Sequence, residues 1–396
     1  MNTIDQASIK GKRVLIRVDF NVPLDNKLNI TDDSRIVAAL PTIKKVINDG
    51  GMAIIISHLG RPKNGFEEKL SLKHVVKHFS NLINANVYFS CDCIGEKVIS
   101  NVAKMKKGDV IVLENLRFYN EEISGDVGFA KKLSALGDIY VNDAFGSAHR
   151  AHASTAIIAR FFPNNKYFGF LLAKEVRSLE KALKNPKRPF TAVIGGAKIT
   201  GKIDVIKSLF EKVDNLIIGG GMAYTFIKAI GGCVGKSLIE NEKMTLARQL
   251  IDEAKKRGVN LCLPIDSINA DIFDNSANTN ISSIFSINEK YMGLDIGGKS
   301  IAKFCDVIQN SKTIIWNGPM GVFEMKKFEE GTKKIGEAVC LATEKNAFSL
   351  VGGGDSIAAL QKFNLESRVS YISTGGGAML EYLEGKRLPG VVAIMD

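Results

Sequence analysis

Four arginines stand where they could bind one small anion together. Arg61, Arg117 and Arg150 each come soon after a short apolar run, and Arg35 opens a helical pattern beyond another such run. The planar guanidinium can bind a carboxylate or a phosphate through two parallel hydrogen bonds. Arginines scattered over a surface would not share this placement, so the pattern predicts a pocket for a small ligand with several negative charges.

Other polar residues accompany these arginines. Asp19 and Asn21 come just after the apolar run at 13–17 and could hydrogen-bond to substrate hydroxyl groups. Arg35 places a cation in the first turn of a helix, where it opposes the helix dipole, and a bound anion is one reason for a charge in that place. His58 also follows an apolar run. A lone histidine is more often a hydrogen-bonded structural residue than a catalyst, so we assign it a positioning role.

Residues 191–206, TAVIGGAKITGKIDVI, predict a strand, a glycine turn and a helix. Such a junction offers unpaired backbone N–H groups and the positive end of a helix dipole to an anion. Lys198 and Lys202 add two positive charges one helical turn apart. The same letters also suit an ordinary strand-to-helix connection with two surface lysines, so this segment alone leaves both interpretations open.

Several later apolar runs end in double or triple glycines, where the backbone could approach a nucleotide closely. Asp355 follows one triple glycine and could be a helix N-cap or an oxygen ligand for Mg²⁺. Glu324 could accept from a ribose hydroxyl. Residues 293–300 fit the phosphate-binding pattern G-x-x-x-x-G-K-[ST], but no apolar strand leads directly into them, so we give the match little weight.

Short apolar runs alternate with helical patterns along the whole chain, which predicts parallel sheets with helical crossovers. The runs of the first half are 13–17, 52–57, 110–113 and 139–141. Those of the second half are 191–196, 216–221, 261–264, 313–318, 348–354 and 369–377. A helical pattern at 168–184 separates the two series, and 396 residues suit two domains, so we place the boundary there.

Composition indicates a globular enzyme, with 45% hydrophobic and 24% charged residues. No apolar run approaches 18 residues and the first residues lack a signal-peptide pattern, so we expect a cytoplasmic protein without a membrane partner. The net charge of +11 could serve nucleic acid, a membrane surface or small acidic ligands. Because the basic residues form no dense block and no aromatic RNA-binding motif is present, we expect no nucleic-acid partner.

Taken together, the motifs resemble the phosphoglycerate kinase family, and the resemblance covers essentially the whole chain. The matching motifs occur in the family's order: RVLIRVDFNVP at 13–23, HLGR at 58–61, LENLRF at 113–118, AHRAHAST at 148–155, GGAK at 195–198, WNGP at 316–319 and GGGDS at 352–356. Each motif alone is modest evidence, but the full set in this order is highly specific.

The resemblance implies reversible phosphoryl transfer from 1,3-bisphosphoglycerate to ADP, giving 3-phosphoglycerate and ATP, by a monomer that uses Mg²⁺. It implies that phosphoglycerate is bound by Asp19, Phe20, Asn21, Arg35, His58, Leu59, Gly60, Arg61, Arg117 and Arg150. It implies that ADP or ATP is bound by Lys202, Gly293, Glu324, Gly353, Gly354, Asp355 and Ser356, with Asp355 as the metal ligand. We expect Arg35 and Lys198 to be the catalytic charges, meeting the transferred group from opposite domains.

The predicted fold class is α/β: two Rossmann-like domains, each a parallel sheet flanked by helices, joined by a helix with an open cleft between them. Residues 1–170 form the expected phosphoglycerate-binding domain, to which the resemblance adds residues 388–396 folding back. Residues 171–387 form the expected nucleotide-binding domain.

Two other functions fit parts of the sequence. A nicotinamide-dependent oxidoreductase would also have paired α/β domains and glycine turns, but no glycine run here completes the dinucleotide-binding pattern G-x-G-x-x-G. A basic nucleic-acid-binding protein would explain the net charge and predicts steeply salt-dependent binding without nucleotide turnover.

Overall fold

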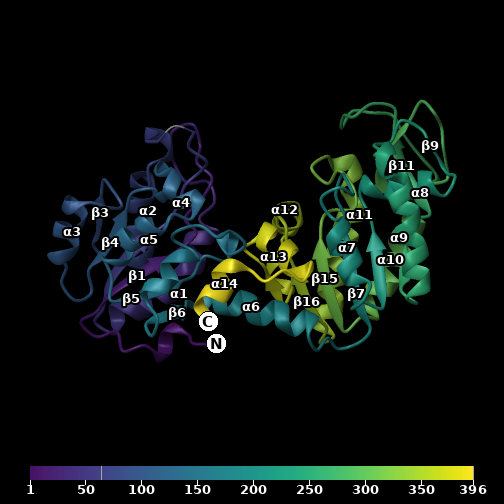
Figure 1. Ribbon diagram of the computed structural model, residues 1–396. Helices are drawn as coiled ribbons and strands as arrows, with labels where there is room; N and C mark the ends of the chain where they lie inside the picture. Colours follow the sequence, from purple (N-terminus) through teal and green to yellow (C-terminus); the bar gives the residue numbers. More distant parts are fainter. Residues whose placement is uncertain (64, 396) are drawn as a thin grey trace. The chain divides into compact units, whose positions relative to one another are not determined.

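The computed structural model describes residues 1–63 and 65–395, which form two compact units (Figure 1). The N-terminal unit comprises Met1–Arg177 together with the C-terminal segment that begins at Arg387, and the C-terminal unit comprises Ser178–Lys386. The division falls within helix α6, Phe170–Leu183. Helix α14, Pro389–Met395, belongs to the N-terminal unit, where the Gly390 N–H donates to the Ala148 carbonyl at 2.8 Å.

The N-terminal unit is built on a six-stranded sheet in which every neighbouring pair is parallel. The strand order is β3-β4-β2-β1-β5-β6. The strands are β1 Arg13–Arg17, β2 Met52–Ile56, β3 Val87–Ser90, β4 Val110–Leu113, β5 Ile139–Asn142 and β6 Lys166–Phe168. The main helices are α1 Ser34–Asn48, α2 Lys73–Ile83, α3 Glu96–Ala103, α4 Asn120–Ser124 and α5 Val127–Ser134.

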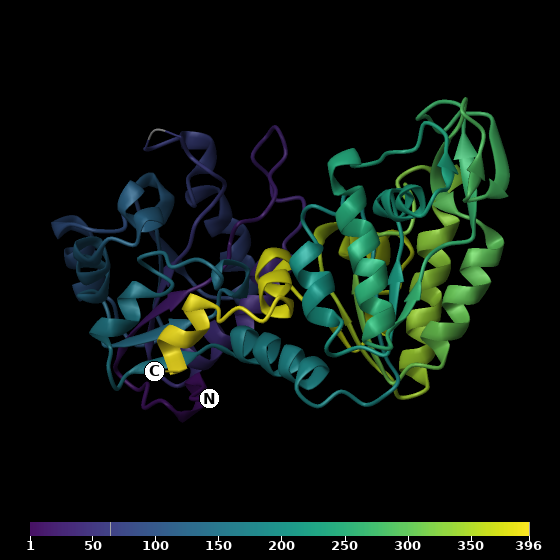
Figure 2. The same cartoon turned by 45° about the vertical axis from the view of Figure 1, so that its right-hand side comes forward.

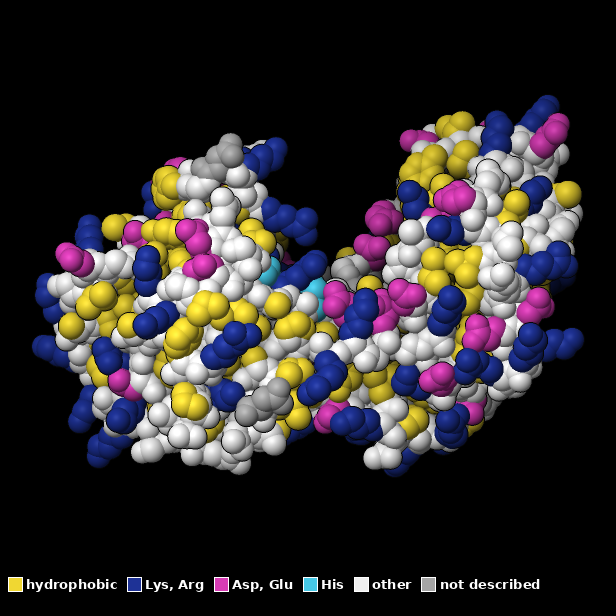
Figure 3. All heavy atoms as spheres, viewed as in Figure 1, with side chains coloured by type: hydrophobic (Ala, Val, Ile, Leu, Met, Phe, Trp, Pro, Cys, Tyr) yellow, Lys and Arg dark blue, Asp and Glu magenta, His cyan; other side chains and the backbone are white. Residues whose placement is uncertain are grey.

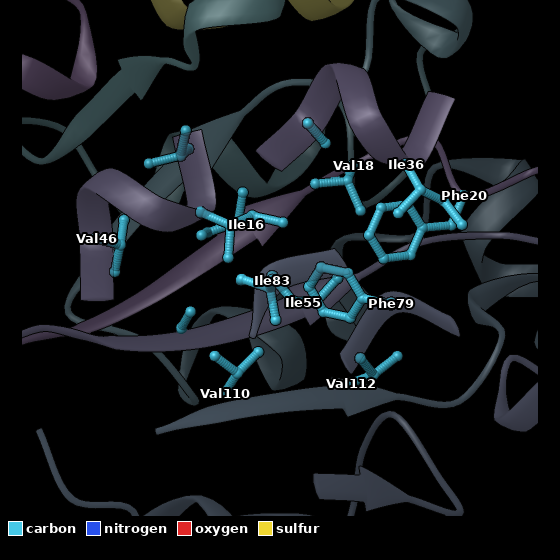
Figure 4. Packing of buried hydrophobic residues seen from close by; sticks show 14 of the residues in the cluster. Ile16, Val18, Phe20, Ile36, Val46, Ile55, Phe79, Ile83, Val110 and Val112 are labelled. Atoms are coloured by element: carbon cyan, nitrogen blue, oxygen red, sulfur yellow. The ribbon is translucent and has the colours of Figure 1, made fainter. Parts of the chain in front are cut away.

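Alternate strand residues build the core on one face of this sheet, because successive side chains of a strand point to opposite faces (Figure 4). Ile16, Ile55 and Val112 come from three neighbouring strands, while α1 and α2 bring apolar residues at helical spacing, such as Ile36 and Phe79. The other strand face is buried as well, which is why the strands read as continuous apolar runs.

The C-terminal unit repeats this architecture with a second all-parallel sheet of order β10-β8-β7-β15-β16-β17. Its strands are β7 Phe190–Ile194, β8 Asn215–Ile218, β10 Asn260–Cys262, β15 Thr313–Asn317, β16 Phe348–Val351 and β17 Tyr371–Ile372. Its helices are α7 Ile203–Leu209, α8 Met222–Ala229, α9 Met244–Lys256, α10 Gly298–Gln309, α11 Glu330–Glu344, α12 Gly354–Lys362 and α13 Gly376–Leu383. In each unit, helices lie on both faces of the sheet (Figures 1 and 2).

The predicted α/β fold with two parallel sheets is confirmed, and each strand predicted from an apolar run is present. The edge strands β3 and β6 and two small sheets of the C-terminal unit were not predicted. These small sheets contain β11 Asp266–Ala270, β12 Thr279–Ser283 and β14 Met292–Ile296, and β9 Cys233–Val234 with β13 Ser286–Ile287. The missed strands lack a continuous apolar run: β3 and β12 are half-exposed, β6, β9 and β13 are very short, and polar residues or glycine interrupt the buried β11 and β14. Across the described residues, no helix is both long and apolar enough to cross a membrane.

Each large sheet has a point where the chain reverses its direction of travel across the sheet. In the N-terminal unit the chain runs from β1 outward through β2 and later returns to β5 on the other side of β1. In the C-terminal unit it runs from β7 to β8 and β10, and returns to β15 on the other side of β7. Open α/β sheets bind ligands beyond the carboxyl ends of the strands at such points. Most of the expected site residues follow strands of the two large sheets, whereas Gly293 lies within β14 of a small sheet.

Candidate functional site

In the N-terminal unit, hydrogen bonds tie together the loops that follow β1, β2 and β4. The Asn21 side-chain oxygen accepts from the Gly60 N–H at 2.7 Å, and Arg117 Nη1 donates to the Gly60 carbonyl at 2.8 Å. Gly60 has a φ of +64°, and a Cβ there would lie 2.5 Å from Leu70 Cδ2. The position therefore needs glycine, and the three loops form one edge of linked polar groups.

Arg35 lies in the first turn of α1 and pairs with the loop after β1. Its Nη1 donates to Asp19 Oδ2 at 3.3 Å and to the Asn21 carbonyl at 2.9 Å. The Asp19 carboxylate therefore offsets part of the cost of a cation at a helix N-terminus. A bound anion is not needed to explain its place, although 36% of the Arg35 side chain remains exposed.

The other arginines of this edge have too few negative partners. Arg117 is partly buried, and its Nε has no hydrogen-bond partner in the described chain. Burial, followed by the charge of Arg17, lowers the Arg117 pKa to about 10. The guanidinium groups of Arg61 and Arg150 are exposed, and among the described residues neither has a hydrogen bond or an ion pair. Burial and the charges of Arg17, Arg117 and Arg150 also lower the pKa of His152 to about 4. After burial, the main contributions to these shifts come from neighbouring arginines, and a bound anion would offset their charge.

The side chains of Phe20 and Leu59 are buried in the protein, although both residues were predicted to bind substrate. Phe20 packs against Phe79 with ring centroids 5.1 Å apart, and its N–H is bonded to the Ser57 hydroxyl at 2.8 Å. The Leu59 carbonyl accepts from Asn115 Nδ2 at 2.7 Å. Phe20 and Leu59 therefore hold these loops in shape through buried side chains and backbone hydrogen bonds.

Sequence reasoning missed the polar residues that anchor these loops. Asn115 is fully buried; besides Leu59, its Nδ2 donates to the Leu70 carbonyl at 2.9 Å, and its Oδ1 accepts from the Arg117 N–H at 3.0 Å. Glu114 accepts from the Leu72 N–H at 2.9 Å. The available signal was a pair of polar residues directly after a fully apolar strand, where a buried loop must satisfy its backbone.

In the C-terminal unit the glycines bring backbone against backbone. The Gly195 N–H donates to the Asn317 carbonyl at 3.0 Å, and a Cβ on Gly195 would lie 2.1 Å from the Pro319 oxygen. A Cβ on Gly220 would lie 2.6 Å from the Gly196 nitrogen. The loops after β7, β8 and β15 thus pack at distances that no side chain would permit.

Lys202 is held in this packed region. Its Nζ donates to the Asn317 carbonyl at 2.9 Å and to Asn317 Oδ1 at 2.5 Å. Burial lowers the Lys202 pKa to about 8, against the opposing effect of Asp355. Neither Asn317 atom carries a full charge, so the ammonium group would gain from an anion placed beside it.

A cavity of about 680 Å³ opens among these loops and is lined mainly by apolar atoms. Three of the predicted nucleotide-binding residues, Gly293, Glu324 and Asp355, line it. Its other walls include Gly196, Gly220, Tyr224, Leu238, Phe273, Met292, Leu294, Pro319, Met320 and Val322. The size and the combination of apolar walls with a few polar groups are typical of sites for small organic ligands.

Helix α12 begins beside this cavity. Its N-cap is Gly353, with a φ of +96°, and no side chain caps its first N–H groups. Asp355 lies inside the first turn, exposed and without a hydrogen bond or ion pair to the described residues, so its interpretation as an N-cap is wrong. Ser356 is buried and its Oγ accepts from the Gly318 N–H at 2.6 Å, which ties this helix to the loop after β15.

The strand-turn-helix segment at 191–206 differs from the prediction in one respect. Lys202 is the N-cap of α7, so Lys198 lies in the preceding loop and is exposed. The N–H groups of Ile199 and Thr200 are not free, because they donate to the Glu240 carboxylate at 2.5 and 3.4 Å. The protein's own carboxylate therefore occupies these two loop N–H groups, while Lys198 and Lys202 remain as charges that could meet an anion.

The pattern match at 293–300 is not a phosphate-binding loop. Its first four residues belong to β14, and the N–H groups of Lys299 and Ser300 donate to the Asp266 carboxylate at 3.0 and 2.8 Å. Asp266 thus caps the N-terminus of α10, where such a loop would hold phosphate. The low weight given to this motif is confirmed.

The two units form an α/β protein in which one sheet edge carries arginines with few negative partners and the other carries a glycine-lined cavity, an arrangement that suits a phosphotransferase for small anionic substrates. The phosphoglycerate kinase family model matches residues 4–386, and the chain belongs to this family. It therefore catalyses the reversible transfer of a phosphoryl group between 1,3-bisphosphoglycerate and ADP, a reaction of glycolysis.

Relatives and solved structures agree with this assignment. The chain is 52% identical to a phosphoglycerate kinase of Porphyromonas gingivalis, with 99% of both chains covered, and 50% identical to one of Chloroherpeton thalassium, covering 100% of this chain and 99% of that one. A phosphoglycerate kinase structure from Coxiella burnetii matches with a TM-score of 0.90 at 41% identity, over 99% of this chain and 98% of that one. One from Pyrococcus horikoshii matches at 0.82 and 31% identity, over 100% and 98%.

Proposed function

We propose that the arginine edge of the N-terminal unit binds phosphoglycerate and that the cavity of the C-terminal unit binds ADP or ATP. The observation that carries the first assignment is the set of guanidinium groups without counter-ions, of which Arg117 is the most buried. The proposed phosphoglycerate ligands are Asp19, Phe20, Asn21, Arg35, His58, Leu59, Gly60, Arg61, Arg117 and Arg150. Phe20 and Leu59 would act by holding the loops in shape, because their side chains are buried and their backbone groups bond to Ser57 and Asn115.

The apolar walls of the cavity suit the flat face of a nucleotide base, and Glu324 is exposed at its edge, where it could accept from a ribose hydroxyl. The uncapped N-terminus of α12, formed by Gly353, Gly354, Asp355 and Ser356, is a favourable place for the phosphates. Lys202 would add a positive charge, and Gly293 lines the cavity without a side chain that could obstruct the base.

The proposed chemistry requires no nucleophilic side chain. The donor is an acyl phosphate with a good leaving carboxylate, so correct placement and stabilisation of charge suffice. During direct in-line transfer, negative charge spreads over the equatorial oxygens of the moving group. We assign the stabilisation of this charge to Arg35, whose side chain is partly exposed beside its Asp19 partner, and to the exposed Lys198.

Asp355 is the proposed ligand for Mg²⁺. Its carboxylate is exposed, unpaired and beside the cavity, and a carboxylate oxygen is a donor that Mg²⁺ prefers. Among the described residues no group of three acidic, histidine or cysteine side chains could hold a metal, which suits an ion bound by one carboxylate and the nucleotide phosphates. When bound, the ion would neutralise phosphate charge, while Asp355 fixes its position.

Small-molecule substrates rather than nucleic acid are the proposed partners, and we propose a cytoplasmic monomer. On the face shown in Figure 3, Lys and Arg are interspersed with Asp and Glu and form no continuous basic track. A nucleic-acid-binding surface would gather its positive charge along the path of the backbone.

The decisive experiment is a coupled assay with purified protein, 3-phosphoglycerate, ATP and Mg²⁺, comparing Arg35→Ala and Lys198→Ala with Arg160→Ala. Arg160 is exposed in the N-terminal unit and has no side-chain partner among the described residues, which makes it a matched control. We expect each of the first two variants to lower kcat by roughly 100-fold or more, as for other single electrostatic donors. Near-normal kcat in both would remove these residues from the mechanism.

A further inference from the structure

Arg17 is a fully buried arginine at the end of β1 whose charge has no direct carboxylate partner in the described structure. Its Nε donates to the Ser154 hydroxyl at 2.8 Å, and its Nη1 donates to the Val18 carbonyl. Its Nη2 lies 3.1 Å from Nδ1 of His58. The guanidinium group therefore connects β1 to a histidine after β2 and to a serine beyond β5.

The contact with His58 fixes where the proton of the imidazole lies. A guanidinium group has five N–H donors, no acceptor, and does not lose its proton in proteins. At 3.1 Å, Nδ1 of His58 must be the acceptor, so it carries no proton. The ring is then neutral, with its single N–H at Nε2. This Nε2 has no hydrogen-bond partner among the residues that the structure describes.

We propose that Arg17 is a positioning residue that holds His58 as the neutral Nε2–H tautomer, so that His58 offers the bound phosphoglycerate a hydrogen-bond donor and not a charge. The inference rests on the proposed place of His58 in the phosphoglycerate site. It assigns Arg17 a role distinct from that of the exposed arginines, because its guanidinium is buried and each of its three nitrogens is hydrogen-bonded within the protein.

The far end of Arg17 is anchored by a second buried charge. The Ser154 hydroxyl that accepts from Arg17 donates to Glu122 at 2.6 Å, and the Ser154 N–H donates to the same carboxylate at 2.9 Å. Glu122 is fully buried in α4. Arg17 donates at both ends, to Ser154, which in turn donates to Glu122, and to Nδ1 of His58, so this buried network fixes the orientation of the guanidinium group toward the imidazole.

The charges around His58 act in the same direction. Burial comes first in lowering the pKa of His58 well below its ordinary value, and the charges of Arg17, Arg117, Arg35 and His152 lower it further. Every group in this set is basic. His58 should therefore remain neutral throughout the range in which an exposed histidine gains its proton.

Nitrogen NMR of the imidazole rings in the ligand-free, full-length protein tests the proposal directly. We expect His58 to show a protonated Nε2 and an unprotonated Nδ1, unchanged between about pH 5.5 and 7.5, a range centred on the ordinary pKa of histidine. A proton on Nδ1, or an imidazolium within this range, would overturn it. Addition of 3-phosphoglycerate should then shift the Nε2 signal. If the tautomer is as expected and the signal does not move, the site assignment fails while the action of Arg17 stands.

Variants separate positioning from mere packing. Arg17→Lys keeps a donor without an acceptor and should keep the tautomer. Arg17→Met removes the donor that faces Nδ1, so the imidazole should also populate the Nδ1–H tautomer, visible in the same NMR measurement, and KM for 3-phosphoglycerate should rise. If Arg17→Met does not fold, a second pair applies. His58→Gln can place an amide N–H near the position of Nε2, whereas the shorter side chain of His58→Asn cannot. We therefore expect KM for 3-phosphoglycerate to be at least threefold lower in His58→Gln than in His58→Asn, with similar kcat in the two variants. Equal KM values in the two variants would contradict the proposal.

Discussion

The two units share one architecture, but the candidate site of the N-terminal unit is built mainly from side chains and that of the C-terminal unit mainly from backbone. In the N-terminal unit, charged side chains form the candidate site, and buried polar groups such as Asn115 fix the loops that carry them. In the C-terminal unit, glycines let loops pack backbone to backbone around a cavity. One parallel sheet can therefore present an anion site through guanidinium groups or through packed loops, and the two designs should fail under opposite changes: removal of a side chain or addition of one.

The largest effect is expected from adding a methyl group to the C-terminal unit. Gly195→Ala would place a Cβ 2.1 Å from the Pro319 oxygen, which is backbone and cannot turn aside. We expect the free energy of unfolding to fall by about 3 kcal/mol, as in overpacked interiors, with loss of nucleotide binding. Gly201→Ala is the matched control in the same loop, since a Cβ there meets nothing within 4 Å, and it should change stability by at most about 0.5 kcal/mol. Denaturant titration measures both, and equal stabilities would contradict the close-packing account.

Removal of a side chain should be the damaging change in the N-terminal unit. Arg117→Ala takes away a partly buried charge whose Nε lacks a protein partner, so we expect KM for 3-phosphoglycerate to rise about 10- to 100-fold, the equivalent of one or two charge-assisted hydrogen bonds. KM for ATP should change little. Steady-state kinetics at fixed ionic strength check this, with Arg160→Ala as the control. A larger rise in KM for ATP than in KM for 3-phosphoglycerate would show that Arg117 does not belong to the phosphoglycerate site.

A smaller, pH-dependent effect is expected at Lys202. Its pKa in the folded protein is about 8, below the ordinary 10.5, so the folded state binds fewer protons between these values and the ligand-free protein gains stability as the pH rises from 8 to 10.5. Nucleotide binding should show the opposite trend, because phosphate favours the charged amine. We expect KM for ATP to rise severalfold above about pH 8. Lys202→Arg should remove this rise, since arginine stays charged, and persistence of the rise in that variant would point to another group.

The smallest effect is expected at Lys299, where the motif pattern suggested a phosphate-binding lysine. Asp266 already occupies the N–H groups at that helix start. Lys299→Ala should therefore leave kcat and KM for ATP within about twofold, compared with the large loss expected from Lys198→Ala. A loss of 100-fold in the Lys299 variant would restore the phosphate-loop interpretation.

The sequence predicted the strands of the two large sheets, except the edge strands β3 and β6, and the polar residues that follow them, because both signals are local. A strand buried on both faces must be apolar throughout, and Arg61, Arg117, Arg150 and Asp355 stand out directly after such runs. The small sheets were missed because β12 is short, polar and half-exposed. The family resemblance supplied the division of ligands between the halves, which composition and periodicity could not.

The sequence by itself determined the fold class, the family and the positions from which chemistry could come. Only the tertiary structure decided which of those groups are free. It showed that Glu240 and Asp266 occupy N–H groups in two segments that resemble anion sites. It also showed that every guanidinium nitrogen of Arg17 is hydrogen-bonded within the protein, whereas those of Arg61 and Arg150 have no partner among the described residues. The physical reason is that a hydrogen bond joins residues far apart in the chain: whether a charge or an N–H group can meet a ligand depends on what the fold has already brought to it.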